Sequence, residues 1–551
     1  MSSDGSPQPS SSSPVPAHRR RPRTPPKWVW IVLLLIGVLV AIVRGADVFG
    51  DHAFDNVATV ILCFVGFVVL AVWFLFLSGY HWLSRLLVAG GCVAVAAALA
   101  VLFRIERLNG ELVPVFAYRF SAKPDRLLEV PPAITEGKGA NADLRTTTKD
   151  DFPGFLGPHR NEAVDGVKLA RNWTERPPTL VWRQKIGAGW SAFAVVNGHA
   201  VTMEQRGEME MTTCYNIETG RLEWAHSISG RYERVEAGIG PRSTPTIDDG
   251  MVFSLGVRGH LACLDGASGK PIWEKDLLKE YGIPEEEEEA VVLWGRSASP
   301  LVVGDKLIVP VGGPKGGRLV TLAAFDKRRG TVIWEGGNRQ VSYCSPSLAT
   351  LRGIEQILIV NEDTASGQDA KTGKTLWEQS RPGRTNEKPN VSQAVPIAPN
   401  FVFLSKDYGL GAMLLRLDPA DGGVFKTHIV WENHRLMKTK FANVTILDGY
   451  VYGLSDGILE CIEAATGTGK WKQGRYGHGQ ILRVGDLLLV LTEEGEVVLV
   501  EATPERPNHV LGRFQAIEGQ TWNNLALYGP YLLVRNAEEA ACYKLPLEEK
   551  R

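Results

Sequence analysis

A short spacing pattern recurs six times between residues 216 and 471 of this 551-residue chain. Each copy starts with an acidic or amide residue, has a glycine four positions later, and ends in a tryptophan. The copies begin at Asn216, Asp265, Asp326, Asp369, Asp418 and Glu463, and an insertion delays the tryptophan of the fifth. A pattern repeated at near-constant spacing indicates one supersecondary unit copied around a ring or along a solenoid.

The distance between successive tryptophans selects among the repeat architectures. It ranges from 40 to 61 residues along the series Trp182, Trp224, Trp273, Trp334, Trp377, Trp431 and Trp471, which suits a four-stranded propeller blade better than a helical repeat. Tight turns that open apolar strands supply a second marker. They occur at Asn197-Gly198, Asp249-Gly250, Gly304-Asp305, Pro399-Asn400, Asp448-Gly449, Gly485-Asp486 and Gly529-Pro530, with a weaker equivalent at Arg352-Gly353. The two markers predict an all-β domain over residues 152–547, an eight-bladed β-propeller of four-stranded antiparallel blades.

Closure of the ring gives a prediction about strand order. Residues 178–182 should pair with the last blade, around residues 526–545, because an unclosed ring would expose strand edges. Small residues six positions before the turn glycine, among them Cys214, Cys263 and Cys461, mark a crowded position in each unit. We therefore interpret these cysteines as buried small side chains in separate blades, too far apart for disulfides.

The N-terminal part has a different composition. Residues 1–27 are rich in Ser, Pro and Arg, which predicts a disordered basic tail. Three uncharged apolar runs follow at residues 28–43, 57–77 and 86–103, each about the length needed to cross a hydrocarbon core of ~30 Å. Three transmembrane α-helices are therefore expected before the propeller, with the lipid bilayer as their partner.

The distribution of basic residues predicts the orientation in the membrane. Basic residues collect in the tail, which places it in the cytoplasm. An odd number of crossings then puts the propeller outside, in the periplasm of a bacterial inner membrane. Residues 104–151 lack periodicity and are expected to be a linker.

Charge and motif content exclude several functions. The formal net charge of -1 gives no footprint for nucleic acid. The run of five glutamates at residues 285–289 is expected to be a solvated loop. The eleven histidines form no His-x-His or His-Glu-x-x-His pattern, so the sequence predicts no metal site.

The repeat resembles a known one at residues 264–273, Leu-Asp-Gly-Ala-Ser-Gly-Lys-Pro-Ile-Trp. This segment is similar to the tryptophan-docking repeat of pyrroloquinoline quinone (PQQ) enzymes and of the non-catalytic outer-membrane assembly lipoproteins of the BamB type. The lead-in at residues 151–158 is similar to the start of many such propellers. The resemblance implies that each repeat tryptophan, from Trp182 to Trp471, has a structural role in docking against the backbone of the next blade.

The innermost strands of a propeller line its central channel, and residues just before those strands are candidates for a ligand site. They form a mixed basic and aromatic set, suited to an anionic and planar ligand: Arg242, Trp294, Arg296, Tyr343, Lys440, His478, Trp522 and Asn523. The alternative interpretation is that these side chains satisfy inner-strand carbonyl groups in a filled channel. No catalytic residue is predicted.

Two functions remain. The first is a binding or scaffold module for an envelope protein, peptide or anionic ligand, without a cofactor. The alternative is a PQQ-dependent quinoprotein dehydrogenase that passes electrons to the membrane quinone pool; the resemblance implies that such an enzyme would hold PQQ with Ca²⁺ and use a catalytic aspartate. No such constellation is evident, which favours the binding module. A carboxylate pair facing Arg242 and Arg296 would favour the enzyme, and Glu236 is the one nearby acid in the sequence.

Overall fold

The computed structural model describes residues 24–46, 52–131, 142–382 and 389–549. The chain divides into two compact units, and residues 105–551 form most of the second. Most of the tail predicted for residues 1–27 lies outside the described residues.

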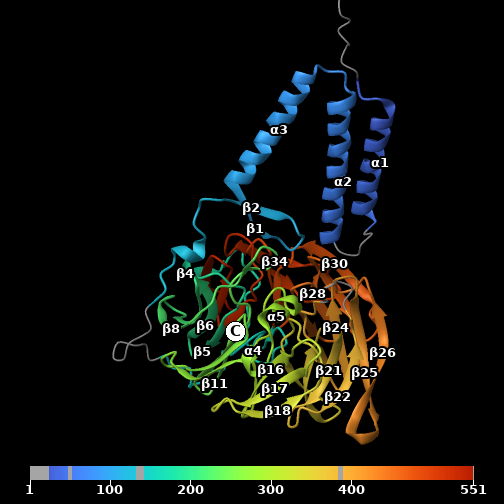
Figure 1. Cartoon of the computed structure of the whole chain (residues 1–551). Helices are drawn as coiled ribbons and strands as arrows, with labels where there is room; N and C mark the ends of the chain where they lie inside the picture. Colours follow the sequence, from blue (N-terminus) through green and yellow to red (C-terminus); the bar gives the residue numbers. More distant parts are fainter. Residues whose placement is uncertain (1–23, 47–51, 132–141, 383–388, 550–551) are drawn as a thin grey trace, which may run out of the picture. The chain divides into compact units, whose positions relative to one another are not determined.

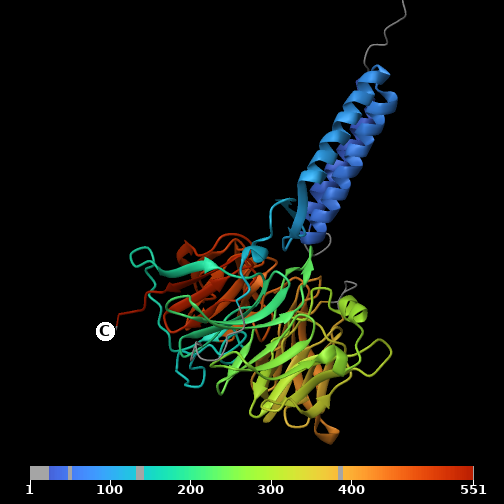
Figure 2. The ribbon, with the colours of Figure 1, turned by 60° about the vertical axis from the view of Figure 1, so that its left-hand side comes forward.

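The first unit contains three helices that are long and apolar enough to span a membrane. They are α1 (Lys27–Gly45), α2 (His52–Val72), which continues as a π-helical turn (Trp73–Leu77), and α3 (Trp82–Leu102). The helices α1 and α2 lie side by side (Figures 1 and 2). The prediction of three apolar helices is confirmed.

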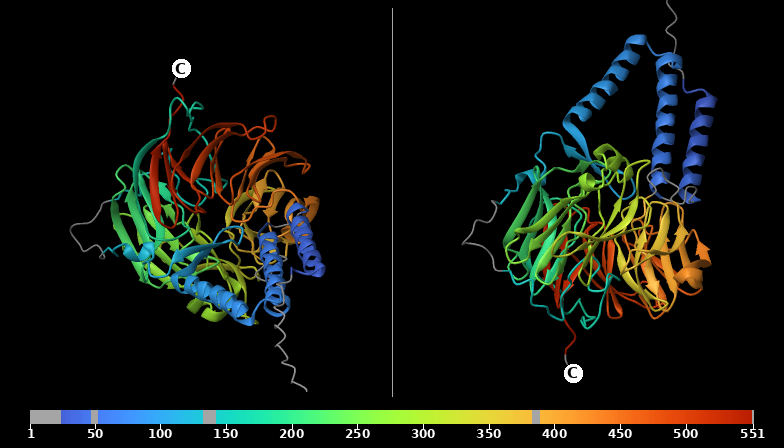
Figure 3. Two further views of the ribbon diagram at one scale, coloured as in Figure 1. Left: turned by 90° about the horizontal axis from the view of Figure 1, so that it is seen from above. Right: turned by 60° about the horizontal axis from the view of Figure 1, so that its bottom comes forward.

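The second unit contains eight four-stranded antiparallel blades arranged in a ring (Figure 3). Blades 1 to 4 consist of β5 (Ala194–Val196), β6 (His199–Arg206), β7 (Met209–Asn216) and β8 (Leu222–Ser229); β11 (Thr246–Asp248), β12 (Met251–Leu255), β13 (His260–Asp265) and β14 (Pro271–Asp276); β15 (Leu301–Val303), β16 (Lys306–Gly312), β17 (Val320–Asp326) and β18 (Val332–Gly336); and β19 (Ser347–Leu351), β20 (Ile354–Val360), β21 (Thr364–Asp369) and β22 (Thr375–Ser380). Blades 5 to 8 consist of β23 (Val395–Ile397), β24 (Phe401–Lys406), β25 (Gly411–Ala420) and β26 (Val424–Asn433); β27 (Val444–Leu447), β28 (Tyr450–Ser455), β29 (Ile458–Glu463) and β30 (Gly469–Arg475); β31 (Gln480–Val484), β32 (Leu487–Leu491), β33 (Glu496–Glu501) and β34 (Val510–Gln515); and β35 (Ala526–Tyr528), β36 (Tyr531–Arg535), β37 (Glu539–Lys544) and β4 (Thr179–Lys185). All eight predicted turns join the first and second strands of a blade, so the predicted fold is confirmed.

The hydrophobic core lies between the faces of neighbouring blades. The middle strands are buried on both faces, which is why β32 is a run of five consecutive aliphatic residues, all buried. The largest apolar cluster joins blades 7, 8 and 1 and includes Phe152 and Trp173 from the segment before the ring. The ends of the chain segment that forms the ring are thus covered by apolar packing.

Blade 8 closes the ring with strands from both ends of the domain. The strand β4 pairs with β37 in antiparallel register, and Trp182 lies opposite Cys542. A second short strand, β3 (Ala163–Val164), adds in parallel to β31 of blade 7. Figure 3 shows the first and last parts of the domain next to one another. The predicted pairing of residues 178–182 with the last blade is confirmed.

The repeat tryptophans join successive blades. In five cases the indole N–H donates to a backbone carbonyl of the next blade: Trp182 to Ile217, Trp224 to Gly266, Trp273 to Lys327, Trp431 to Ala464 and Trp471 to Thr503. The turn glycine of the next repeat lies under the ring; a Cβ at Gly269 would be 2.5 Å from the Trp224 ring. Trp334 likewise lies over Gly373. Only glycine fits under these rings, since any side chain there would collide with the indole.

Trp377 differs from the other repeat tryptophans. Its indole N–H donates to the side chain of Gln356 in its own blade, and the ring packs on Gly367. The following repeat carries the insertion, which lengthens the β25–β26 hairpin (Figure 1) and leaves open space around its glycine, Gly422. The insertion therefore removes the surface on which Trp377 would have docked.

The small residues of the repeat lie directly opposite the tryptophans on the neighbouring strand. Cys214, Cys263, Cys461 and Cys542 pair with Trp224, Trp273, Trp471 and Trp182 in the strand register, and all four cysteines are buried. A large side chain at this position would compete with the indole for the same space. Each cysteine thus belongs to the tryptophan packing of its own blade.

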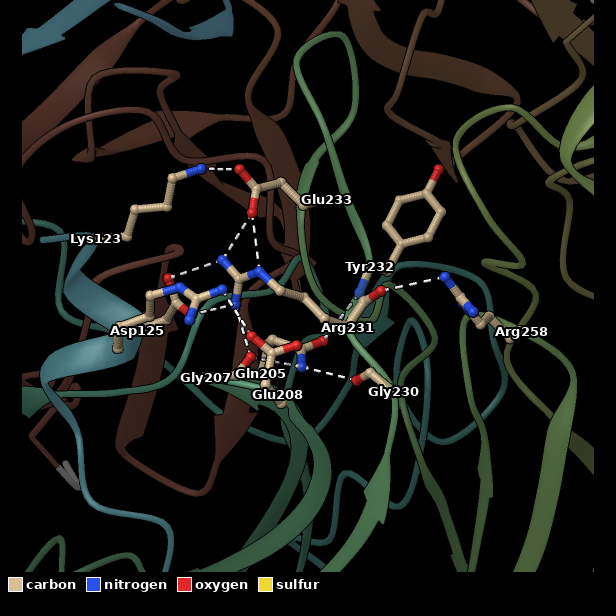
Figure 4. Close-up of polar contacts among 11 residues, drawn as sticks. Lys123, Asp125, Gln205, Gly207, Glu208, Gly230, Arg231, Tyr232, Glu233 and Arg258 are labelled. Atoms are coloured by element: carbon tan, nitrogen blue, oxygen red, sulfur yellow. Dashed lines mark hydrogen bonds and ion pairs between the residues drawn. The ribbon is translucent and has the colours of Figure 1, made fainter. Parts of the chain in front are cut away.

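The segment expected to be a linker, residues 104–151, contains ordered structure. The strands β1 (Phe103–Leu108) and β2 (Pro114–Tyr118) form a hairpin, and a 3-10 turn follows at Pro124–Leu127. Asp125 is 1% exposed and accepts a hydrogen bond from Arg231 of the propeller at 2.6 Å, beside an ion pair between Lys123 and Glu233 (Figure 4). These contacts hold the part of the predicted linker around Lys123 and Asp125 against the propeller.

Candidate functional site: the central channel

Polar side chains link the inner strands around much of the channel. The side-chain oxygens of Thr244, Ser299 and Ser345 each accept a backbone N–H from the preceding blade, at 2.9–3.0 Å. Asn443 does the same for Gln393. Asn523, one of the predicted site residues, donates to the carbonyl groups of Gly189 and Ser191 and so joins blade 8 to blade 1. Asn523 therefore follows the alternative interpretation, in which channel residues satisfy inner-strand backbone groups.

Aromatic rings fill one level of the channel. Trp294 stacks on Tyr343 with centroids 4.8 Å apart, Phe441 lies 5.8 Å from Trp294 and 4.9 Å from Trp522, and Trp522 lies 4.9 Å from Trp190. These rings come from five different blades. They leave a cavity of about 120 Å³. Four predicted site residues, Arg242, Trp294, Tyr343 and Trp522, line it.

The same cavity is lined by one cation and one acid, Arg242 and Glu236. The Arg242 guanidinium donates to the carbonyl oxygens of Gly240 and Ala237 and lies 4.7 Å from the centroid of the Tyr232 ring. Burial lowers the pKa of Arg242 to about 10, so the side chain remains a cation at neutral pH. Within the described ranges no carboxylate forms an ion pair with it. The cavity is thus an aromatic box with a positive charge in its wall.

Arg296 does not line the cavity. It is 2% exposed, pairs with Glu288 at 2.7 Å, and donates to the carbonyl groups of Pro310 and Val311. Glu288 belongs to the glutamate run, which forms the helix α5 (Glu285–Val291) where we expected a solvated loop. That expectation was wrong, because one carboxylate of the run turns inward to neutralise a buried arginine. The acid that Arg296 requires is thus 8 residues away in sequence and 2.7 Å away in space.

The loop between β1 and β2 lies against residues at one mouth of the channel. The backbone of Gly110 donates to Glu493 at 3.1 Å and accepts from Lys440 at 3.2 Å, and Gln520 donates to the carbonyl of Leu108. A Cβ at Gly110 would lie 2.3 Å from the His478 ring, so the loop fits only with glycine at its tip. Of two predicted site residues, Lys440 therefore donates to the backbone of this loop, and the His478 ring lies against its glycine.

Glu493 accepts three N–H groups at this mouth of the channel, from Gly110, His478 and Trp522. Burial would raise the pKa of its carboxyl, but the neighbouring His478 and the N–H groups of His478, Gly110 and Trp522 outweigh burial and lower it. Burial and the nearby Lys440 lower the pKa of the His478 ring. Lys440 also lies 3.9 Å from Asp407. The charges at the mouth are therefore matched within the protein itself.

The segment before the first blade also reaches the channel, through Arg160. Arg160 donates to the carbonyl groups of Ser299, Pro300 and Pro346 and to the Thr246 hydroxyl, at the starts of the inner strands of blades 2 to 4. Burial lowers its pKa to about 9. The loop that carries it has positive φ at Leu156, Gly157, Arg160 and Glu162, a strained backbone that tertiary contacts hold in place. Phe155 of the same loop lines the cavity.

Sequence reasoning missed the partners that occupy the channel: Arg160, Glu288, Glu493 and the loop at residues 109–113. One signal was available. The turns that follow the second strand of blades 5, 6 and 7 carry an acid in each case, Asp407, Asp456 and Glu493. Acids repeated in equivalent turns place negative charge around one channel mouth, close to Lys440 and His478.

Comparison with known proteins identifies the family. The profile of the family described as outer membrane protein assembly factor BamB matches residues 174–335 and 233–473, together more than half of the chain. The chain belongs to this family. Its propeller is accordingly of the BamB-like, PQQ-repeat type.

Curated relatives are distant and match in part. The quinoprotein alcohol dehydrogenase PedH of Pseudomonas putida is 22% identical over 179 residues, 25% of this chain and 29% of that protein. The 1-butanol dehydrogenase (quinone) of Thauera butanivorans is 21% identical over 196 residues, 32% of this chain and 29% of that protein. The matched part of this BamB-like chain thus spans about 29% of the length of either relative.

Two solved structures are similar to this chain at low sequence identity. BamB from Moraxella catarrhalis is 16% identical, with 67% of this chain and all of that chain covered and a TM-score of 0.46. A quinohemoprotein alcohol dehydrogenase from Comamonas testosteroni is 12% identical, with 75% and 84% covered and a TM-score of 0.49.

The cavity of this BamB-like propeller does not fit PQQ with Ca²⁺. Ligand pockets for organic cofactors commonly measure ~300–1,000 Å³, whereas this cavity measures about 120 Å³. Ca²⁺ takes ~6–8 oxygen ligands, usually including several carboxylates, and in the described part of the chain Glu236 is the one carboxylate that lines the cavity. The side chains of Phe155, Phe441 and Trp522 are part of the wall of this small cavity.

Proposed function

We propose that this protein is a membrane-anchored binding or scaffold module of the bacterial envelope, with its propeller on the periplasmic side of the inner membrane. The observation that supports it most directly is the content of the channel. The chain's own loop at residues 109–113 and the Arg160 side chain bind channel residues, and the aromatic rings leave a cavity of only about 120 Å³. Recognition then falls to the perimeter of the ring.

The perimeter offers apolar strand surfaces. The outermost strands expose adjacent aliphatic residues just before the repeat tryptophans: Val332 and Ile333 on β18 and Ile429 and Val430 on β26, each 40–44% exposed. An outermost strand has one edge without a strand partner, and a peptide or a partner strand binds such an edge through backbone hydrogen bonds. The partner that this surface fits is an envelope protein or peptide that adds an extended segment.

A small anion is the ligand that the channel itself fits. Arg242 supplies a positive charge, and Trp294 and Trp522 supply flat apolar walls. A cavity of about 120 Å³ admits a group the size of a carboxylate with a small planar body. Such a ligand would supplement the scaffold role.

The alternative function is a quinoprotein dehydrogenase. The names of the two curated relatives favour it, and so do the apolar helices, which would place an enzyme beside the membrane quinone pool. The residues around the cavity weigh against it. We therefore place it second.

One experiment with two arms separates the two functions. Full-length protein in detergent is titrated with PQQ, with and without Ca²⁺, while tryptophan fluorescence and dye reduction with alcohols are recorded. We expect no saturable quenching up to about 1 mM, the range of negligible affinity. Saturation at micromolar PQQ with alcohol-dependent dye reduction would establish the dehydrogenase instead.

The second arm examines the perimeter in cells. A photo-crosslinking residue is placed at Ile333 or Val430, and at the exposed Asp486 on a turn of blade 7 as the matched control. We expect discrete adducts with an envelope protein from the strand positions and none from Asp486. Equal labelling at all three positions would contradict a specific docking surface.

A further inference from the structure

Two histidines and a glutamate meet where blades 1 and 2 face one another. His226 lies on β8 of blade 1, and His260 and Glu274 lie on β13 and β14 of blade 2. Both histidine Nε2 atoms are 2.9 Å from the same oxygen, Oε1 of Glu274. One ligand atom from each of the three residues lies within 4.8 Å of the other two.

The strand register explains why these side chains meet. Glu274 pairs with Ala262, so His260 is its diagonal neighbour on the same face of the sheet. His226 reaches the pair from the neighbouring blade, where it lies opposite Thr212. The cluster is therefore built on three regular strands, β8, β13 and β14, which hold its atoms more firmly than loops would.

Two of the three separations in the cluster are close to those in a metal site. Two ligands bound ~2.0–2.1 Å from one tetrahedral Zn²⁺ ion lie about 3.3 Å apart. The two observed 2.9 Å separations differ from that value by a few tenths of an ångström. Side chains that are 15%, 29% and 32% exposed also leave the cluster open to ions from solvent.

A second observation points to a cation at this place. Glu210 is 4% exposed, and its Oε1 has no hydrogen-bond partner among the described residues. It shares with His226 and His260 the lining of a cavity of about 10 Å³. That volume is about the lower limit for one water molecule. A carboxylate oxygen buried without a donor is costly, and a metal-bound water would supply the donor.

We propose that His226, His260 and Glu274 bind one divalent transition-metal ion of the Zn²⁺ class. Two imidazoles and one carboxylate form a ligand set typical of zinc, and the fourth position is filled by a water directed toward Glu210. The ion joins β8 of blade 1 to β13 and β14 of blade 2. This site is independent of the channel and of the scaffold role. No sequence motif indicates it, because its ligands come from three strands of two blades.

A second cluster of similar composition provides an internal control. His199, Cys214 and Glu223 of blade 1 also lie within reach of one another. There His199 uses both ring nitrogens, one with Glu223 and one accepting the Asp143 N–H. Burial raises the pKa of the Cys214 thiol, whereas a metal requires the thiolate. This cluster is therefore complete without an ion.

The test uses full-length protein in detergent, purified with a tag that contains no histidine and stripped with a chelator. Isothermal titration with Zn²⁺ should give one ion per chain. His226→Gln, His260→Gln and Glu274→Gln should each weaken binding at least about 100-fold, since even partners outside the metal's own ligands contribute ~10–100-fold. His199→Gln should bind like the wild type. Glutamine keeps a hydrogen-bond donor beside Glu274, and metal-free melting curves show whether each variant is folded.

X-ray absorption of the zinc-loaded wild type gives an answer that does not depend on any variant. We expect scattering from nitrogen and oxygen with two imidazole rings and no sulfur. Sulfur at ~2.3 Å would place the ion at Cys214 and overturn the proposal. Absence of stoichiometric binding to the wild type at 100 µM Zn²⁺, or unchanged binding in both histidine variants, would also overturn it.

Discussion

The closure of the channel by the loop between β1 and β2 can be tested with one methyl group. Gly110→Ala adds a Cβ that would lie 2.3 Å from Cδ2 and 2.9 Å from Cγ of the His478 ring. Carbon atoms in contact are ~3.5–4.0 Å apart, so the loop or the ring must move by more than an ångström. The His478 ring packs against Phe441, and the backbone N–H of His478 donates to Glu493. The loop is therefore the part that leaves.

The magnitude follows from the contacts that the loop would lose. Gly110 makes two hydrogen bonds with charged side chains, Glu493 and Lys440, each worth ~1.5–3 kcal/mol. Their loss weakens docking of the loop by about 3–6 kcal/mol at most, because water replaces part of it. At 1.4 kcal/mol per tenfold change, hydrogen exchange of residues 105–118 should accelerate by about 10²–10⁴-fold.

The assay is hydrogen exchange followed by mass spectrometry, with acrylamide quenching of tryptophan fluorescence as a second readout. Quenching should rise because Trp522, which donates to Glu493, becomes accessible. Gly469→Ala is the matched control, since a Cβ there has its nearest neighbour at 4.0 Å. If exchange in residues 105–118 is the same in both variants as in the wild type, the loop does not close the channel and the reasoning fails.

Three further predictions concern stability, each measured by thermal melting of the full chain in detergent. Trp224→Ala should destabilise the propeller by about 3–5 kcal/mol, because the side chain is fully buried between two blades; a loss below about 1 kcal/mol would show that the ring closes without it. Glu288→Gln should cost about 3–5 kcal/mol by leaving Arg296 as an uncompensated buried cation, and a smaller loss in the double variant with Arg296→Met would support that cause. Burial and the nearby Arg381 lower the pKa of Lys406 to about 7 from 10.5. The unfolded chain therefore binds more protons between these two values, and the free energy of unfolding should rise with pH from about 7 to 10.5, by at most about 1.4 kcal/mol per pH unit. A Lys406→Met variant whose stability has the same slope against pH would contradict this.

The fold could be predicted from sequence because its determinants are repeated. A tryptophan needs a small residue across the strand and a glycine in the next blade, and both requirements recur at fixed spacing, as for Cys214, Trp224 and Gly269. Hairpin turns add an independent count. Closure by β4 followed from the cost of an open edge. Local rules applied many times thus reinforce one another, and one departure, at Trp377, does not alter the result.

The candidate site could be predicted only in part. Arg242, Trp294, Tyr343 and Trp522, which were named from their positions along the inner strands, line one cavity, and a role in ligand binding remains a prediction. Position could not indicate which cations already have partners. Arg296 is neutralised by Glu288, and Lys440 holds a backbone carbonyl 330 residues away. The direction of a side chain near the channel depends on such single contacts, which leave no periodic trace in the sequence.

The segments that fill the channel have a feature in common: neither belongs to a repeat. The loop at residues 109–113 and the loop carrying Arg160 both precede the first blade. Each makes contacts that are not repeated from blade to blade. A ring built from similar units presents similar surfaces all around, so what is specific to this chain must come from segments and pairings outside the repeat. By the same argument, the proposed metal ligands matter because His226, His260 and Glu274 occur at one blade junction, and the exposed aliphatic pairs matter because they remain uncovered. A search for partners should therefore begin at the outer strands and not at the channel.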